Sequence, residues 1–241
     1  MEENFCVYGA RKTWRQLNRE RMCMARCTVE RLMLQMRLQA ARRGEAFKTS
    51  IPDLGASRPP DLVDRQFVAT RPNQSWVADF ICLAPWPGFV FVAFVIDVYS
   101  RMIVGWRVSR TATAELALDA LEQALHAGRR KERLIHHSDR GSQHLSIRYT
   151  ERLSECGIQA SVGRTGDSRD NAPAETINGL CEAEVNWRRG PRRSLEPVEH
   201  STLEWVERFD NRRLLAPIGD VPPADLEHAY CLQQESVAKA A

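Results

Sequence analysis

The sequence predicts an α/β protein: a mixed sheet of about five strands flanked by helices and preceded by a small helical segment. The apolar run FVFVAFVIDV, residues 89–98, is typical of a strand buried on both faces. Strand candidates lie on both sides of it, and amphipathic helical stretches alternate with the later ones. A polar stretch with three prolines separates this part from two basic helices at the N-terminus.

Composition excludes several classes of protein. The chain has 241 residues, 43% of them hydrophobic and 27% charged, as is usual for a globular protein with a substantial core. No apolar run approaches the ~18 residues that span a bilayer, and the N-terminus lacks the apolar stretch of a signal peptide. The seven cysteines are scattered, without histidines at zinc-finger spacing. We therefore expect a cytoplasmic protein with free thiols and no zinc site.

Residues 1–48 are expected to form a basic helical unit. Residues 1–60 carry 12 Lys and Arg against 6 Asp and Glu, whereas residues 61–241 carry 22 against 25. Amphipathic stretches at 10–20 and 28–38 predict two short helices around a tight link, residues 21–27. This pattern indicates a helix-turn-helix, with a simple helical hairpin as the alternative. Its candidate DNA-binding residues are Arg11, Lys12 and Arg15.

The rest of the chain divides in order. Residues 49–66 read as a linker, 67–230 as the main domain with a C-terminal helical extension, and 231–241 as a tail. Strands expected at 75–84, 89–98 and 102–109 would form an antiparallel meander. A helix at 113–128, a strand at 133–139, a helix at 144–156 and a strand at 158–163 follow. The last expected helix, 172–187, tolerates Pro173 because it lies in the first turn.

Three carboxylates are the candidate catalytic and metal-binding residues. Asp79 lies among apolar residues of a strand, where a charge is costly unless something compensates it. Asp139 closes the fourth strand, and Glu175 opens the last helix. If the first and fourth strands are neighbours, all three carboxylates converge and repel one another, a cost that a divalent cation removes. Ligands that are all oxygen favour Mg²⁺ or Mn²⁺, and two such ions can cleave or join phosphodiesters.

Five stretches carry a family resemblance: WVADF, VIDVYSRMIVGW, HHSDRGSQ, DNAPAETINGL and NRRLLAPIGDVPPA. Together they resemble the integrase-core transposases of bacterial insertion sequences, of the "IS three" type, whose second reading frame encodes the catalytic half. The resemblance runs from about Tyr8 to about Tyr230. It implies an RNase H-like fold of the retroviral-integrase type, with residues 67–230 as the integrase catalytic core. It also implies a DDE triad of Asp79, Asp139 and Glu175 and favours the helix-turn-helix over the hairpin.

The same resemblance implies a reaction and its partners. The expected chemistry is strand cleavage at the ends of the element, followed by attack of the 3′-hydroxyl on target DNA, with two Mg²⁺ or Mn²⁺ ions. The expected partners are double-stranded DNA of the terminal repeats and the target, further copies of the chain, and a first-frame protein. Arg140 and Asn171 match motif positions beside the triad and are expected to shape the site and contact DNA. Arg188 and Arg189, in the basic run WRRGPRR, complete the expected DNA contacts.

Other polar residues near the motifs are expected to be structural. Asp97 should pair with Arg101 or cap its turn in preference to binding metal. Asp167 and Asp170 are expected to be turn and cap residues. His136 and His137 should lie in the strand, one on each face.

The chain also departs from the family pattern. It begins inside that pattern, as an N-terminally truncated member would. Arg21 and Arg37 stand where the family commonly has glycine, and Cys181 and Glu182 stand where an aromatic residue and a lysine are usual. The leading hypothesis is an Mg²⁺-dependent DNA transposase, and the main alternative is a DNA-binding remnant that folds but does not transpose. A ribonuclease H or a retroviral-type integrase is a further alternative.

Overall fold

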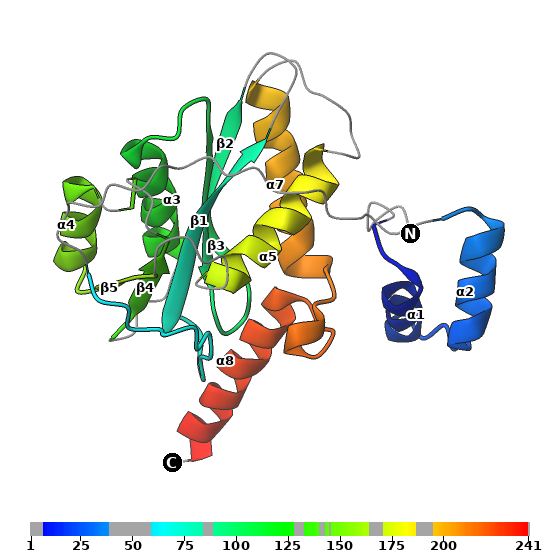
Figure 1. Ribbon diagram of the computed structural model, residues 1–241. Coiled ribbons are helices and arrows are strands. Elements are labelled where there is room, and N and C mark those ends of the chain that lie inside the picture. The colour runs from blue at the N-terminus through cyan, green and yellow to red at the C-terminus, as the bar shows by residue number, and fades with distance from the viewer. Residues whose placement is uncertain are drawn as a thin grey trace.

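The computed structural model confirms the mixed α/β sheet. It describes residues 7–38, 59–83, 89–127, 133–139, 143–144, 146–163, 171–186 and 195–240. One five-stranded sheet has the order β3-β2-β1-β4-β5, with helices on both faces (Figure 1). The strands are β1 (Ser75–Leu83), β2 (Val90–Asp97), β3 (Ile103–Ser109), β4 (Ile135–Ser138) and β5 (Gln159–Val162). The first three form the expected antiparallel meander, and β4 and β5 continue the sheet in parallel with β1.

The helices follow the expected order, and the C-terminal extension is largely helical. They are α1 (Ala10–Arg19), α2 (Arg26–Gln35), α3 (Ala114–Ala127), α4 (Ile147–Glu155), α5 (Ala172–Cys181), α7 (Leu195–Arg212) and α8 (Pro223–Ala240). A π-helical turn, η3 (Glu182–Asn186), continues α5, and a 3₁₀ turn, η4 (Ala216–Ile218), lies between α7 and α8. None of the described helices is both long and apolar enough to cross a membrane. The six cysteines within the described residues are free thiols.

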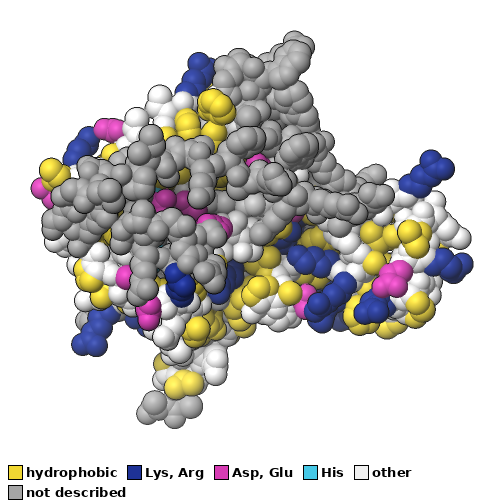
Figure 2. All heavy atoms as spheres, viewed as in Figure 1, with side chains coloured by type: hydrophobic (Ala, Val, Ile, Leu, Met, Phe, Trp, Pro, Cys, Tyr) yellow, Lys and Arg dark blue, Asp and Glu magenta, His cyan; other side chains and the backbone are white. Residues whose placement is uncertain are grey.

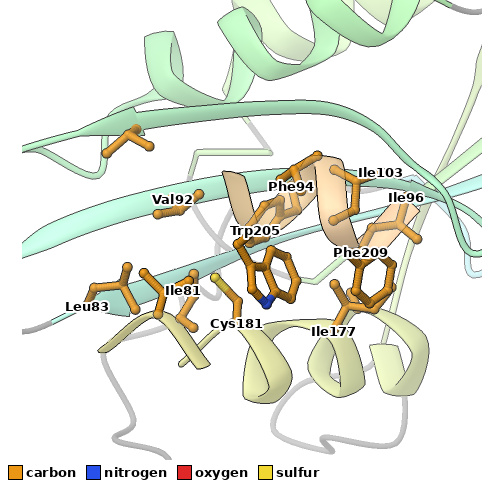
Figure 3. Packing of buried hydrophobic residues seen from close by; sticks show 14 of the residues in the cluster. Ile81, Leu83, Val92, Phe94, Ile96, Ile103, Ile177, Cys181, Trp205 and Phe209 are labelled. Carbon is orange, nitrogen blue, oxygen red and sulfur yellow. The ribbon is translucent and has the colours of Figure 1, made fainter. Parts of the chain in front are cut away.

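Alternation along β1 divides the core into two layers. Val77, Ile81 and Leu83 face α5 and α7, where side chains such as Ile177 and Trp205 cover them (Figure 3). Trp76 and Ala78 point to the opposite face, which α3 and α4 cover with their own buried stripes. Because both faces are covered, β2 is apolar along nearly its whole length, as the run at 89–98 predicts.

One glycine lets a helix approach the sheet closely. A Cβ at Gly105 of β3 would collide with the carbonyl oxygen of Ala120 and with Ala124. Only glycine therefore allows α3 to lie this close to the edge strand.

Parts of the expected linker and tail are ordered elements of the fold. Within 59–66, the Leu62 N–H donates to Ser161 Oγ at 2.9 Å, and the Val162 N–H donates to the Pro60 carbonyl at 3.4 Å. Val63 is buried. These residues therefore run along β5 instead of spanning free space. Helix α8 continues to Ala240, so the expected tail is mostly helical.

A buried carboxylate joins η3 to α7. Glu184 accepts a hydrogen bond from Trp205 Nε1 at 2.9 Å and forms ion pairs with Arg208 and Arg213, the latter at 2.5 Å. All four residues are 5% exposed or less, so the two cations meet the carboxylate away from water. Burial favours the neutral form of a guanidinium and lowers the pKa of Arg208, while the charge of Glu184 opposes that change.

The N-terminal helices are attached to the C-terminal part of the chain. The Tyr8 hydroxyl accepts a hydrogen bond from the Leu214 N–H at 2.8 Å and donates to the Arg212 carbonyl at 3.3 Å. Within the helical unit, Trp14 Nε1 donates to the Met24 carbonyl at 2.7 Å and fixes the link between α1 and α2. Val29 and Met33 of α2 are buried, whereas Met36 is 57% exposed because α2 ends before it.

Both helices of this unit end with an arginine in the left-handed conformation. Arg21 has φ 62° and Arg37 has φ 54°. Behind them, the Met22 N–H reaches the Leu17 carbonyl and the Leu38 N–H reaches the Met33 carbonyl, the 6→1 bond of a Schellman motif. These are the two positions where the family pattern commonly has glycine, the residue that adopts positive φ without strain.

Replacing these arginines should stabilise the helical unit. Arg21→Gly and Arg37→Gly should each raise the free energy of local unfolding by about 1 kcal/mol, because glycine has no Cβ to strain at positive φ. Amide hydrogen exchange of α1 and α2 measures this. Arg31→Gly is the control: it removes the same charge from inside α2 and should lower local stability by about 1 kcal/mol. A similar loss in all three variants would contradict the assignment.

The two strand histidines lie on opposite faces, as predicted. His136 Nε2 is 3.0 Å from the Tyr149 hydroxyl, and His137 Nδ1 is 2.9 Å from Ser161 Oγ. Burial, with smaller contributions from the neighbouring His144 and His137, lowers the pKa of His136 to about 3. Since burial also raises the pKa of Tyr149, its hydroxyl keeps its proton and donates to a neutral imidazole.

Acid should destabilise the fold through His136. Its folded pKa lies below the unfolded value, so its stabilising contribution is complete above about pH 6.5 and is lost as pH falls towards 3. The loss should be roughly 1 kcal/mol per pH unit. His136→Gln keeps an acceptor for Tyr149 and should flatten this dependence in urea titrations at several pH values. The matched variant His200→Gln, whose side chain is 70% exposed, should leave it unchanged. Equal slopes for wild type and His136→Gln would contradict the prediction.

Candidate active site

The register of two parallel strands places Asp79 beside Asp139. β1 and β4 pair in parallel with Ala78 opposite Ser138. The residues that follow these two are Asp79 and Asp139. Residues paired in this way point to the same face of a sheet. For Asp79 this is the face of Val77 and Ile81, which α5 covers. The condition on which the expected convergence of Asp79 and Asp139 depends, that the first and fourth strands are neighbours, is therefore met.

The electrostatics of Asp79 show that Glu175 shares this site. The pKa of Asp79 is raised well above its ordinary value, first by burial, then by the charge of Asp139 and more weakly by that of Glu175. Two hydrogen bonds act in the opposite direction: the Phe80 N–H donates at 2.8 Å and Asn178 Nδ2 at 3.0 Å. Negative charge thus accumulates at a half-buried position, and local hydrogen bonds offset only part of its cost.

Helix α5 brings Glu175 to this edge of the sheet. Asn171 lies at its N-terminus and donates from Nδ2 to the Ala78 carbonyl at 3.0 Å, which ties the start of the helix to β1 next to Asp79. Pro173 lies in the first turn, where its missing N–H costs nothing, and Glu175 follows in the same turn. Asn171 is only 4% exposed, so it shapes the site from beneath; the expected contact with DNA would require its exposure.

Two residues that contact the candidate triad were missed in the sequence. Asn178 lies one turn after Glu175 and donates to Asp79. His144 is 3% exposed, lies 3.2 Å from Asp139 Oδ1 through Nδ1, and packs its ring against Phe80. The signal for Asn178 was its i+3 spacing from Glu175 on one helix face. No comparable pattern marks His144.

Asp97 is a structural residue, as predicted. It is 1% exposed and accepts hydrogen bonds from the N–H groups of Tyr99, Ser100 and Asn73 at 2.9, 2.8 and 2.7 Å. These bonds cap the turn after β2 and leave its carboxylate directed away from the candidate site.

The expected DNA-binding residues of α1 have partners within the chain, although Arg11 remains 64% exposed. Arg11 and Arg15 form ion pairs with Asp220 at 3.7 and 2.9 Å. Lys12 lies over the Tyr8 ring, and burial, aided by the positive charge of Arg213, lowers its pKa to about 8. Arg11 and Arg15 therefore connect α1 to the C-terminal part of the chain. The other candidates, Arg140, Arg188 and Arg189, and the loop residues Asp167 and Asp170, lie outside the described residues.

Glu182, which differs from the lysine usual in the family pattern, is the first residue of η3. It is half-buried, and burial raises its pKa. Its charge in turn contributes to a raised pKa of the Cys82 thiol on β1. The adjacent Cys181 is fully buried in the core below α5 (Figure 3). Glu182 therefore adds negative charge near the end of β1, along the helix from Glu175.

The donor set suits a divalent cation. Asp79, Asp139 and Glu175 offer only oxygen atoms, the ligands that Mg²⁺ and Mn²⁺ prefer. A cation would also offset the mutual repulsion that raises the pKa of Asp79. Within the described residues no three His, Cys, Asp or Glu side chains are already gathered tightly enough to hold a metal ion.

Comparison with known proteins gives a consistent result. The chain matches the family model "Integrase core domain" over residues 69–168 and the model "HTH-like domain" over residues 1–46. It is 51% identical over 240 residues to the "Putative transposase for insertion sequence element IS986/IS6110" of Mycobacterium tuberculosis, covering 98% of this chain and 86% of that protein. It is 54% identical to the "Transposase for insertion sequence element IS629" of Shigella sonnei, covering 95% of this chain and 76% of that one.

Solved structures show the same fold. The HTLV-2 integrase catalytic core domain, in complex with magnesium, aligns with a TM-score of 0.53 at 16% identity, covering 67% of this chain and all of that one. A chain of the simian T-cell lymphotropic virus intasome, bound to the PP2A regulatory subunit B56 gamma, aligns with a TM-score of 0.58 at 13% identity, covering 73% and 61%. The expected RNase H-like fold of the retroviral-integrase type is confirmed.

Proposed function

Because the chain belongs to the integrase-core transposases of bacterial insertion sequences, and is thus a DDE polynucleotidyl transferase, we propose that Asp79, Asp139 and Glu175 are its catalytic triad. The observation that carries the proposal is the parallel pairing of β1 and β4, in which Ala78 lies opposite Ser138 and the next residues are Asp79 and Asp139. Burial and, after it, the charges of Asp139 and Glu175 raise the pKa of Asp79, which supports the same grouping. Three acids that destabilise one another in this way suit a site that works with bound cations.

The reaction has a hydrolytic step and a transesterification step. In the first step water attacks the phosphorus at an end of the element, and the bond to the 3′-oxygen breaks to leave a 3′-hydroxyl. In the second step that hydroxyl attacks a phosphorus of the target strand, whose own 3′-oxygen leaves. When bound, Mg²⁺ or Mn²⁺ ions activate the attacking oxygen and stabilise the leaving one. The first step is a hydrolysis, and the second exchanges one phosphodiester bond for another, so neither needs a further source of energy.

Neighbouring residues hold the carboxylates in position for this chemistry. Asn178 donates one hydrogen bond to the Asp79 carboxylate. The remaining lone pairs of that carboxylate can still bind a cation. His144 restrains Asp139 through the contact of its Nδ1 with Asp139 Oδ1 at 3.2 Å. Asn171 fixes the beginning of α5, and with it the reach of Glu175. Such support keeps the acids preorganised, which is the main contribution of a protein to phosphoryl transfer.

The substrate of an integrase core joined to a helix-turn-helix-like domain is DNA. We propose that the substrates here are the terminal repeats of an insertion sequence and a target duplex. We further propose that several copies of the chain assemble on that DNA, together with a first-frame partner, because two element ends must be joined to one target.

Substitution of the triad tests the catalytic assignment. Asp79→Ala, Asp139→Ala and Glu175→Ala should each abolish Mg²⁺-dependent nicking of terminal-repeat DNA, because each removes a ligand and a charge that the cations require. Circular dichroism and duplex binding should be retained. Glu151→Ala, which removes an acid from the exposed face of α4, should remain active. A triad variant that still nicks DNA with Mg²⁺ would refute the assignment.

Glu182 favours a second candidate, a DNA-binding remnant with weak activity. If α5 and η3 face the incoming DNA, this glutamate opposes a polyanion where relatives of this type commonly have lysine. Glu182→Lys should then strengthen binding of end DNA and strand transfer by 5- to 150-fold, that is by about 1–3 kcal/mol. Strand-transfer assays on matched terminal repeats measure the change. Glu235→Lys, the same charge change on the exposed part of α8, is the control. Equal activity of wild type and Glu182→Lys would remove Glu182 from consideration.

A further inference from the structure

Strand β1 extends past its parallel neighbour at the candidate active site. β4 ends opposite Ala78, whereas β1 continues to Leu83. Phe80 lies in this extension, directly after Asp79, and packs against the layer of side chains beneath α3 and α4. Figure 2 shows Asp and Glu side chains close together at the surface over β1. A side chain that packs on Phe80 therefore lies beside the proposed ligands.

The ring of His144 occupies this position. It packs on the Phe80 ring with the two centroids 4.7 Å apart and the planes tilted by 35°, within the range of stacked aromatic pairs. Tyr149 of α4 also contacts His144, with its ring edge-on and the centroids 5.4 Å apart. His144 and Tyr149 are 3% and 1% exposed, so these contacts leave the His144 ring little room to turn.

Tyr149 is itself fixed to β4. Its hydroxyl donates to His136 Nε2 at 3.0 Å, and the two rings meet edge-on. His136 lies on β4, three residues before Asp139. The buried contacts therefore run from β4 through Tyr149 to His144 and return to the residue that follows β4.

The fixed ring directs a polar atom at Asp139. His144 Nδ1 lies 3.2 Å from Asp139 Oδ1. Since an ionised carboxylate has only acceptors, Nδ1 carries the hydrogen and donates the hydrogen bond. Phe80 contributes to both acids, because its N–H donates to Asp79 Oδ1 at 2.8 Å while its ring supports His144. Asp79 and Asp139 are thus held by two residues that contact each other.

We propose that His144 is a positioning residue for the reaction: supported by Phe80 and Tyr149, it holds the Asp139 carboxylate in place beside Asp79. The proposal rests on the proposed function, since it takes these two acids as ligands of the cations. Residues that hydrogen-bond a ligand from behind orient it, and their loss typically lowers metal affinity or activity by about 10- to 100-fold. A ring that only filled space would need no polar atom at this position.

Two substitutions separate the hydrogen bond of His144 from its packing. His144→Phe keeps an aromatic ring on Phe80 but removes the donor, whereas His144→Asn keeps a donor near the position of Nδ1 and removes the ring. Binding of Mn²⁺ to the full chain, without DNA, is measured by electron paramagnetic resonance, and stability by thermal unfolding. His144→Phe should weaken Mn²⁺ binding about tenfold and unfold no earlier than wild type. His144→Asn should unfold earlier and yet bind Mn²⁺ more tightly than His144→Phe.

The supporting residues provide a coupling test and a control. Phe80→Leu retains the N–H that contacts Asp79. It should weaken Mn²⁺ binding in wild type but not in the His144→Phe variant, because Phe80 acts on Asp139 through the donor of His144. Tyr149→Phe keeps the ring against His144 and removes only the hydroxyl bound to His136. It should lower the unfolding temperature, since His136 loses its donor, and leave Mn²⁺ affinity unchanged.

Nicking of terminal-repeat DNA gives a second readout. In His144→Phe the Mg²⁺ concentration for half-maximal nicking should rise about tenfold, while the rate at saturating Mg²⁺ changes less, because excess cation fills the weakened site. Equal or tighter Mn²⁺ binding by His144→Phe, or additive losses for Phe80→Leu and His144→Phe, would overturn the proposal. Failure of the triad assignment is distinguishable, because Asp139→Ala would then bind Mn²⁺ as tightly as wild type.

Discussion

The buried carboxylate of Glu184 connects most of the structure. It holds η3 against α7 through Trp205 and Arg208, and it reaches the segment after α7 through Arg213. Its charge also acts on Lys12 of the N-terminal unit, where it opposes the lowering of the Lys12 pKa by burial. Removing one partner of such a buried pair typically costs about 3–5 kcal/mol, because the other charge is left without compensation. Three separate parts of the chain therefore depend on one acid.

This cluster also restrains the helix that carries Glu175. Helix α5 is attached at its beginning, where Asn171 donates to the Ala78 carbonyl, and at its end, where η3 delivers Glu184 to the two arginines. A helix held at both ends cannot slide along the sheet, so the height of Glu175 above β1 is fixed. The wider π-helical turn serves this arrangement, since Ala183, Glu184 and Val185 are buried in succession. π-Helical turns of this kind occur frequently beside functional sites.

The sequence was informative wherever a local pattern determines the outcome. The continuous apolar run predicted β2 to within one residue at each end, and the charge among apolar neighbours marked Asp79. The side on which α1 shows its arginines could not be predicted, because their partners Asp220 and Asp225 lie about two hundred residues away. His144 was missed because no local pattern marks a histidine five residues after Asp139 as its partner. The π-helical turn has no sequence period of its own, so a continuous α-helix was expected there.

The bond between Tyr8 and Leu214 spans 206 positions of the chain, which has a consequence for the order of assembly. A ribosome adds roughly 5–20 residues per second, so the N-terminal helices emerge about 10–40 s before the segment that receives them. During that interval the arginines of α1 have no acidic partner from the C-terminal part and remain open to any nearby polyanion. Completion of the chain pairs them with Asp220 and Asp225. A nascent molecule and a finished one thus expose different basic surfaces, although their sequences over these helices are identical.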